Sequence, residues 1–304
     1  MQTFHVKDDT NSEAKDGNAL QSASLVSSPA TALLADDRVE GETIIDLRGQ
    51  NRNGSEFASC EMIGADLGEA SMSECRISDS DLSGATLVKT NMDRSHIEGT
   101  DLTGATGNEP QFFKATLDDV TLADTELHNA NFRSATFTSA IQDANLEGGV
   151  FNEANMADVS DSNMSYAEFT RTDFEDQLIR GSDFTSGTFR GTRMSGARVV
   201  DTEFFKSGIE DADFSNASMS YARITDSEID GTDFTSGEFN DCEFADTTFK
   251  KCDFTGVKFK DCDFTKAVFE DCDMSGAEFV DCRVGTTSFD GKTLKSRPSF
   301  SGSY

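Results

Sequence analysis

From Cys242 to Val284 the sequence repeats every five residues. A large apolar residue occupies the centre of each five-residue unit, and a small residue lies two positions before it. The central residues of this stretch are Phe244, Phe249, Phe254, Phe259, Phe264, Phe269, Met274 and Phe279. Strands alternate with a period of about 2 and amphipathic helices with a period of about 3.6, so neither element explains the pattern. A fixed internal period of this kind indicates a repeat architecture.

The same period extends over most of the 304 residues. It covers residues 57–102, 112–137, 141–156 and 164–294. The period fails at Gly107, and its register shifts before residue 141 and again within residues 157–163. Of the 25 phenylalanines, 21 occupy a central position, so the pattern does not arise from composition alone.

Individual units resemble those of the pentapeptide-repeat family. Examples are Ala65 to Glu69, Ala130 to Ser134 and Cys262 to Lys266, and such units cover about four fifths of the chain. The resemblance implies an all-β fold, a right-handed quadrilateral β-helix of about twelve coils with four pentapeptides per coil. It also implies that the central and small residues point inward and the other three face solvent. Residues twenty apart are then expected to stack.

Three regions are expected along the chain. Residues 1–40 lack the period and are rich in Ser, Ala, Asp and Thr, which predicts a poorly ordered tail. Ser28 and Pro29 could begin a short helix near residues 29–37 that caps the open end of the repeat. The β-helix is expected over residues 41–294, followed by a polar tail over residues 295–304.

The seven cysteines are expected to be buried free thiols. Five of them recur every ten residues at the inward small position, and Ala, Ser or Thr fill the same position elsewhere. The predicted structural core includes these five and three central residues: Cys242, Cys252, Cys262, Cys272, Cys282, Phe244, Phe254 and Phe264. Zinc ligands usually lie a few residues apart, so we expect no metal site and no cofactor. Free thiols fit a reducing compartment.

The formal net charge of −30 excludes nonspecific binding to nucleic acid or to an anionic membrane, because both need a basic surface. Stacking of residues twenty apart predicts two ladders of acidic residues as the candidate protein-interaction surface. The first contains Asp173, Asp213, Asp233, Asp253 and Asp273 and is interrupted by Arg193; the second contains Asp201, Asp241, Asp261 and Asp281 and is interrupted by Tyr221. Three explanations stay open: a functional surface, a salt-rich cytoplasm, or the turn preferences of the repeat itself.

The sequence gives little indication of catalysis. The three histidines are not expected to pair, and neither a phosphate-binding loop nor a nucleophile with its base can be placed. Recognition is more plausible at three irregular places, residues 104–111, 138–143 and 157–163. Their candidate loop residues are Gly107, Pro110, Gln142 and Asp161.

Two functions compete on the sequence. Some pentapeptide-repeat proteins resemble DNA in shape and charge and bind type II topoisomerases, so the resemblance implies a partner such as DNA gyrase or topoisomerase IV. Residues 47–294 carry 47 acidic and 21 basic side chains, which agrees with that idea, but no apolar C-terminal helix follows them. The alternative is an effector delivered outside the cell, favoured by the Ser-rich residues 1–30. No apolar run is long enough to span a bilayer and no secretory signal begins the chain, which predicts a cytoplasmic protein.

Overall fold

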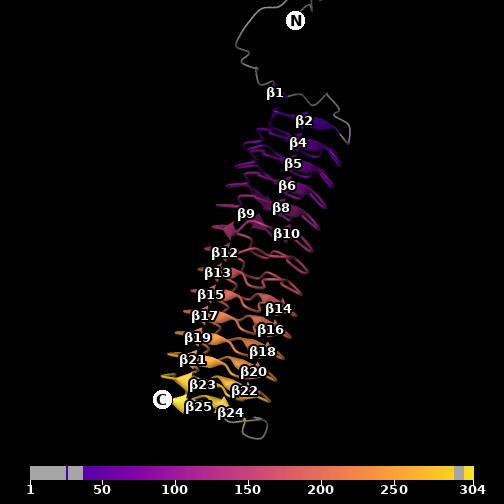
Figure 1. Ribbon diagram of the computed structural model, residues 1–304. Helices are drawn as coiled ribbons and strands as arrows, with labels where there is room; N and C mark the ends of the chain where they lie inside the picture. Colours follow the sequence, from indigo (N-terminus) through magenta and orange to yellow (C-terminus); the bar gives the residue numbers. More distant parts are fainter. Residues whose placement is uncertain (1–24, 27–36, 291–297) are drawn as a thin grey trace, which may run out of the picture.

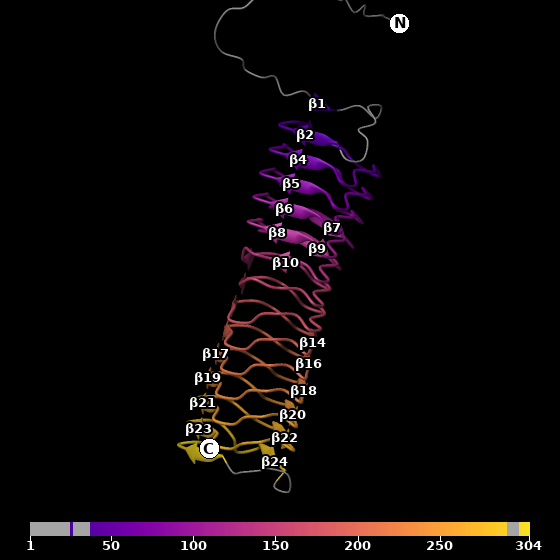
Figure 2. The same cartoon turned by 45° about the vertical axis from the view of Figure 1, so that its right-hand side comes forward.

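The computed structural model describes residues 25–26, 37–290 and 298–304. Within these residues every regular element is a short β-strand, and all the strand pairs are parallel. The strands stack as a β-solenoid of about 13 turns, which makes an elongated rod (Figures 1 and 2). The predicted fold class is therefore confirmed, with about one turn more than the sequence indicated.

The strands have the following bounds: β1 (Leu25–Val26), β2 (Arg38–Glu40), β3 (Thr43–Ile44), β4 (Glu56–Ala58), β5 (Arg76–Ser78), β6 (His96–Glu98), β7 (Thr106–Asn108), β8 (Thr116–Asp118), β9 (Glu126–His128), β10 (Thr136–Phe137), β11 (Ile141–Gln142), β12 (Val159–Ser160), β13 (Leu178–Arg180), β14 (Thr188–Arg190), β15 (Arg198–Val200), β16 (Gly208–Glu210), β17 (Ser218–Ser220), β18 (Glu228–Asp230), β19 (Glu238–Asn240), β20 (Thr248–Lys250), β21 (Lys258–Lys260), β22 (Val268–Glu270), β23 (Glu278–Val280), β24 (Ser288–Phe289) and β25 (Ser299–Ser301).

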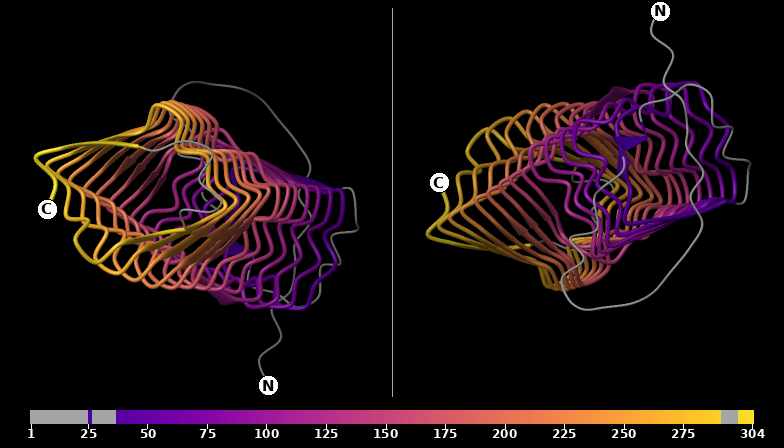
Figure 3. Two further views of the ribbon diagram at one scale, coloured as in Figure 1. Left: turned by 90° about the horizontal axis from the view of Figure 1, so that it is seen from below. Right: turned by 90° about the horizontal axis from the view of Figure 1, so that it is seen from above.

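Four faces surround the interior in the C-terminal half of the rod, and the end views show the coils stacked around that interior (Figure 3). One face is a nine-stranded sheet, in the order β11-β12-β13-β15-β17-β19-β21-β23-β25, and another is a six-stranded sheet, β14-β16-β18-β20-β22-β24. On the two remaining faces only the second residue of each unit, directly before the central residue, forms a bridge. We call them the Asp213 face, with bridges Asp173↔Arg193↔Asp213↔Asp233↔Asp253↔Asp273, and the Glu203 face, with bridges Asp183↔Glu203↔Arg223↔Glu243↔Asp263↔Arg283.

The interior is filled by columns of stacked side chains. The rings of Phe244 and Phe264 stack with centroids 4.9 Å apart, and those of Phe249 and Phe269 stack at 4.7 Å. Phe254 is also fully enclosed. Each ring is covered by the coil above and the coil below, so its burial depends on stacking. Five residues per unit and four units per coil keep like residues in one column.

The fifth residue of a unit turns the chain at a corner, and it often adopts the left-handed backbone region. Examples with positive φ are Asp201 at 51°, Asn216 at 57° and Gly196 at 69°. Gly, Asn and Asp adopt this region more readily than other residues do. The corner thus explains why these three residue types recur in the motif.

The coil length changes in the middle of the rod, where the sequence predicted two shifts of register. The bridge between Glu126 and Asn145 spans nineteen residues, and the next bridge, between Asn145 and Asn163, spans eighteen. The bridge between Asn163 and Asp183 again spans twenty residues. The shortened coils keep their strands: β11 contains Gln142 and ends one residue before the corner residue Asp143, and β12 leads to a corner at Asp161. The expectation of irregular loops at residues 138–143 and 157–163 is therefore wrong, because deletions at corners leave the stacked strands intact.

The third irregular place is also part of the regular stack. Gly107 lies buried in β7, which pairs in register with β9, and the carbonyl of Pro110 accepts a hydrogen bond from Asn131 at 2.9 Å. A Cβ on Gly107 would lie 2.9 Å from the backbone of Leu87. Because Gly107 has no side chain, its coil packs closely against the coil of Leu87. The glycine at this central position therefore allows close packing and does not create a loop.

The ends of the rod differ from the sequence prediction. At the N-terminal end β2 pairs with β4 and β1 pairs with β3, so residues of the expected tail belong to the stack; the expected helix at residues 29–37 lies outside the described residues, apart from Asp37. At the C-terminal end β25 pairs with β23, with Phe300 over Phe279. That spacing is 21 residues, which is why the period of five did not reveal it.

Candidate functional site

The first acidic ladder forms as a column on the Asp213 face. Its members are half-buried, and each carboxylate accepts a hydrogen bond from the backbone N–H two residues later. Examples are Ser215 N–H to Asp213 at 2.9 Å and Thr235 N–H to Asp233 at 2.8 Å. The same bond is made by Asp173, Asp253 and Asp273. These side chains therefore stabilise the turn of each unit as Asx turns, besides carrying charge.

The second ladder lies at the corner that follows the nine-stranded sheet. Asp201, Asp241, Asp261 and Asp281 are exposed and have φ values of 51°, 52°, 54° and 53°. Tyr221 continues the column with a φ of 58°. An aspartate suits this left-handed backbone, so the repeat's own turn preference accounts for part of the acidity.

Turn chemistry explains an Asp or Asn at these positions but not the choice between the two. Asparagine makes the same Asx hydrogen bond in the N-terminal half and the middle of the rod, at Asn91, Asn131 and Asn163. The Asp213 column instead has four successive aspartates, which the bridges place in adjacent coils. Like charges about 4.8 Å apart repel by about 0.9 kcal/mol in water, so this choice has a cost for the fold.

Cations neutralise much of the surface outside that column. Residues 250–266 contain five lysines, and several of them pair with acidic neighbours, including Lys250 with Glu228 and Lys266 with Asp246 at 3.3 Å. Arg193 pairs with both Asp173 and Glu175. The four units 212–216, 232–236, 252–256 and 272–276 contain no Lys or Arg. From Asp213 to Asp273, the outward residues of these units are therefore Asp with Ser, Thr, Asn and Gly.

The cysteines all lie in the interior and are free. Cys262 lies between Cys242 and Cys282, and hydrogen bonds with these thiols, together with burial, raise the pKa of Cys262. A hydrogen bond with Cys272 and burial likewise raise the pKa of Cys252. Each thiol of the ten-residue series also lies near the carbonyl two residues before it, as Cys262 does with Lys260 at 3.3 Å. These contacts are those of small buried side chains, as the sequence analysis expected.

One charged residue of the interior was missed by the sequence analysis. Arg52 occupies an inward central position near the N-terminal end of the rod, with only 4% of its surface exposed, and donates to Gln50 Oε1 at 2.5 Å. Its burial lowers its pKa, while Asp37 opposes that shift. The period of five residues could have revealed it, since Arg52 lies five residues after Leu47 and five residues before Phe57.

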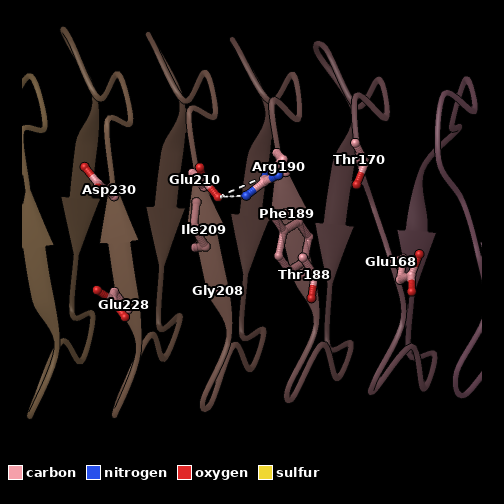
Figure 4. Close-up of a pocket in the computed structure, with 10 residues that line it drawn as sticks. All are labelled: Glu168, Thr170, Thr188, Phe189, Arg190, Gly208, Ile209, Glu210, Glu228 and Asp230. Carbon is pink, nitrogen blue, oxygen red and sulfur yellow. Dashed lines mark hydrogen bonds and ion pairs between the residues drawn. The ribbon is translucent and has the colours of Figure 1, made fainter.

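The surface carries shallow depressions rather than a deep cleft among the described residues. One has a volume of about 580 Å³ and lies on the six-stranded sheet beside Gly208 (Figure 4). It is bordered by Arg190 and Glu210, whose side chains point toward each other and form an ion pair, and by Glu168 and Glu228. Its lining also contains the hydroxyls of Thr170 and Thr188.

The described residues contain no group of three or more His, Cys, Asp or Glu side chains placed to hold a metal. His96 lies 3.4 Å from Glu98 and His128 lies 3.8 Å from Glu147, each on the surface. In the part of the chain that the structure describes, no helix is long and apolar enough to cross a membrane.

Comparison with protein families identifies the repeat. Residues 70–106 and 157–196 match the model of pentapeptide repeats, and residues 232–298 match that of a pentapeptide repeat region. The chain belongs to the pentapeptide repeat family. Proteins of this family are generally structural or binding proteins. No curated protein matches the sequence.

Solved structures of other pentapeptide repeat proteins are similar to this one. A trypsin-treated variant of QnrB1, a plasmid-mediated fluoroquinolone resistance protein, is 18% identical over 72% of this chain and 88% of its own, with a TM-score of 0.29. HetL of the cyanobacterium Nostoc sp. strain PCC 7120, involved in heterocyst differentiation regulation, is 17% identical over 81% and 87%, with a TM-score of 0.23. A protein of the Arabidopsis thaliana thylakoid lumen is 27% identical over 33% and 65%, with a TM-score of 0.21.

Proposed function

We propose that this pentapeptide-repeat rod is a cytoplasmic, non-enzymatic binding protein whose acidic surface engages a protein surface that normally holds DNA. The proposed partner is a type II topoisomerase, DNA gyrase or topoisomerase IV, whose activity the rod modulates. The observation that carries the proposal is the run Asp213, Asp233, Asp253 and Asp273, where asparagine would form the same turn without the repulsion.

The size and charge of the rod support the proposal. About 13 turns at a strand spacing of about 4.8 Å make a rod about 60 Å long. Residues 47–294 carry a net charge of −26, whereas duplex DNA of that length carries about 35 phosphate charges. A rod of this charge density can occupy a basic channel that binds DNA, and its association should be steered electrostatically.

A binding role also agrees with the chemistry of the surface. The described depressions are open and shallow, and their carboxylates face water or cations. Catalytic groups usually need a desolvated cleft that shifts their pKa values. The effector alternative depends on residues 1–30, of which the structure describes only Leu25 and Val26, and no observed feature favours it over the topoisomerase proposal.

Inhibition of gyrase supercoiling by the purified protein tests the proposal. We expect inhibition at low salt that falls steeply as salt increases, because release of counterions drives such contacts. The decisive variant changes Asp213, Asp233, Asp253 and Asp273 to Asn together. It removes four charges and keeps an acceptor for each Asx hydrogen bond, so the fold should remain while inhibition is largely lost. Reversal to Lys would instead break those turns, which makes it a poor test.

The matched control changes four aspartates on other faces to Asn: Asp81, Asp101, Asp183 and Asp263. Each makes the same Asx hydrogen bond, so the change in net charge and in turn chemistry is equal. Inhibition should survive in the control. Equal loss in both variants would show that total charge matters and the Asp213 face does not. No effect of the unmodified protein on either topoisomerase at low salt would refute the proposed partner.

A further inference from the structure

A depression runs around the corner between the nine-stranded sheet and the Glu203 face. Two shallow hollows of about 480 and 540 Å³ meet there and share Gly181, Asp201 and Tyr221. These three residues form one corner column, because they follow β13, β15 and β17, which pair in register. In this column Asp201 lies between Gly181 and Tyr221, one coil from each. We call this region the Tyr221 depression.

Two aromatic residues line the Tyr221 depression. Tyr221 is 60% exposed and has a φ of 58°, a backbone region that bulky residues seldom adopt. An aspartate at this place would continue the column and suit the backbone, as Asp201 and Asp241 do. Phe205 is half-buried on the Glu203 face, and Lys206 Nζ lies 4.7 Å from the centre of its ring. Tyr221 thus presents a large exposed surface that the fold does not require.

The carboxylates of the depression outnumber its cations. Asp183, Asp201 and Glu203 line the hollow on the Glu203 face together with one cation, Arg223. Arg223 forms ion pairs with both Glu203 at 3.7 Å and Glu243 at 3.2 Å. Burial raises the pKa of Glu203, and the nearby charges of Asp183 and Glu243 raise it further against the effect of Arg223. The hollow therefore has an excess of negative charge beside an aromatic surface.

We propose that the Tyr221 depression binds an arginine side chain of a protein partner. A guanidinium stacks on an aromatic face and donates to carboxylates in the same plane, and the depression offers both kinds of group. Exposed tyrosines near a pocket are also frequent energetic centres of protein interfaces. The proposal does not depend on the Asp213 face, because the depression lies on another side of the rod and requires no DNA-like shape.

Titration of the full-length protein with N-acetyl-L-arginine amide tests the proposal. We expect saturable shifts in the NMR amide spectrum confined to residues 180–183, 200–206 and 221–225. The neutral analogue N-acetyl-L-norleucine amide should cause no such shifts. The lysine analogue should bind at least about threefold more weakly, because an ammonium lacks the planar face of a guanidinium.

The variant Tyr221→Asp separates aromatic recognition from simple charge attraction. It adds a negative charge and suits the left-handed backbone, so the fold should be unchanged. If the ring is the binding element, the arginine analogue should bind about three- to fivefold more weakly despite the added charge. The control Tyr166→Asp changes the other exposed corner tyrosine, which has a φ of 61°, and should leave binding unchanged.

Three outcomes would overturn the proposal. Equal or tighter binding by Tyr221→Asp would show that charge alone attracts the ligand. NMR shifts of the parent protein that are spread over all the acidic columns would also show that charge alone attracts the arginine analogue. If the lysine analogue bound as tightly as the arginine analogue, the depression would not be specific for a guanidinium group. An amide spectrum of the variant that matches the parent outside the depression excludes unfolding as the cause of any loss.

Discussion

Neutralising the middle aspartate of the Asp213 column should stabilise the rod at low salt. Asp253 lies between Asp233 and Asp273, one coil away on each side. Each neighbour at about 4.8 Å contributes about 0.9 kcal/mol of repulsion in water, or about 1.7 kcal/mol together. Asp253 also accepts the Thr255 N–H at 2.9 Å, and a charged acceptor strengthens that bond by about 0.5 to 1 kcal/mol over a neutral one. Asp253→Asn keeps the bond in its weaker form, so we expect a net gain of about 1 kcal/mol.

Urea unfolding followed by circular dichroism measures this gain. In 1 M salt the Debye length falls to about 3 Å, so the advantage of Asp253→Asn should vanish or reverse. Asp253→Ala loses the turn bond and should be about 1 kcal/mol less stable than Asp253→Asn at either salt concentration. The control Asp263→Asn keeps its bond to Thr265 but loses the ion pair with Arg283 at 2.8 Å, so it should gain nothing. Destabilisation by Asp253→Asn at low salt would refute the repulsion argument.

Three further predictions concern the interior. Phe264→Ala should cost about 3 to 5 kcal/mol of unfolding free energy, whereas Cys262→Ala should cost about 1 kcal/mol or less, because the thiol leaves a far smaller cavity; rapid labelling of the native thiols would contradict their burial. Burial raises the pKa of Cys75 from 9.0 to about 11. Between these pH values the thiol stays protonated in the folded state and loses its proton in the unfolded state. Stability should therefore fall by about 2 to 3 kcal/mol as the pH rises from 9.0 to about 11, and the fall should be smaller in Cys75→Ala. Gly107→Ala should destabilise by about 1 kcal/mol or more because its Cβ would meet the Leu87 backbone, while Gly208→Ala has open space and should be neutral or slightly stabilising; equal effects of the two would contradict the close packing at Gly107.

The architecture followed from the sequence because every inward position belongs to a short local pattern. A central Phe and a small residue two positions earlier identify the buried side chains without knowledge of any distant contact. Four units per coil then place Asp233 over Asp213 and Phe264 beside Phe244, as the bridges and the stacked rings show. The shifts of register near residues 140 and 160 were also visible, because a local deletion changes the phase of the pattern.

Only the tertiary structure decided what the outward residues do. The sequence left three explanations open for the acidity of the Asp213 column, and one of them was the turn preference of the repeat. The structure shows that these carboxylates accept backbone hydrogen bonds within the turn of each unit. The strand around Phe300 escaped the pattern because it is placed by pairing with β23, 21 residues away.

The sequence placed Tyr221 in the column of Asp201, but it did not reveal the depression beside Tyr221. Gly181, Asp201 and Tyr221 are separated by twenty residues each and belong to three different coils. Outward side chains are not restricted by packing, so neither hydropathy nor the period distinguishes them from their neighbours. A periodic sequence therefore determines the interior of a solenoid and the columns of its surface, while the hollows and hydrogen bonds of that surface depend on how the coils stack.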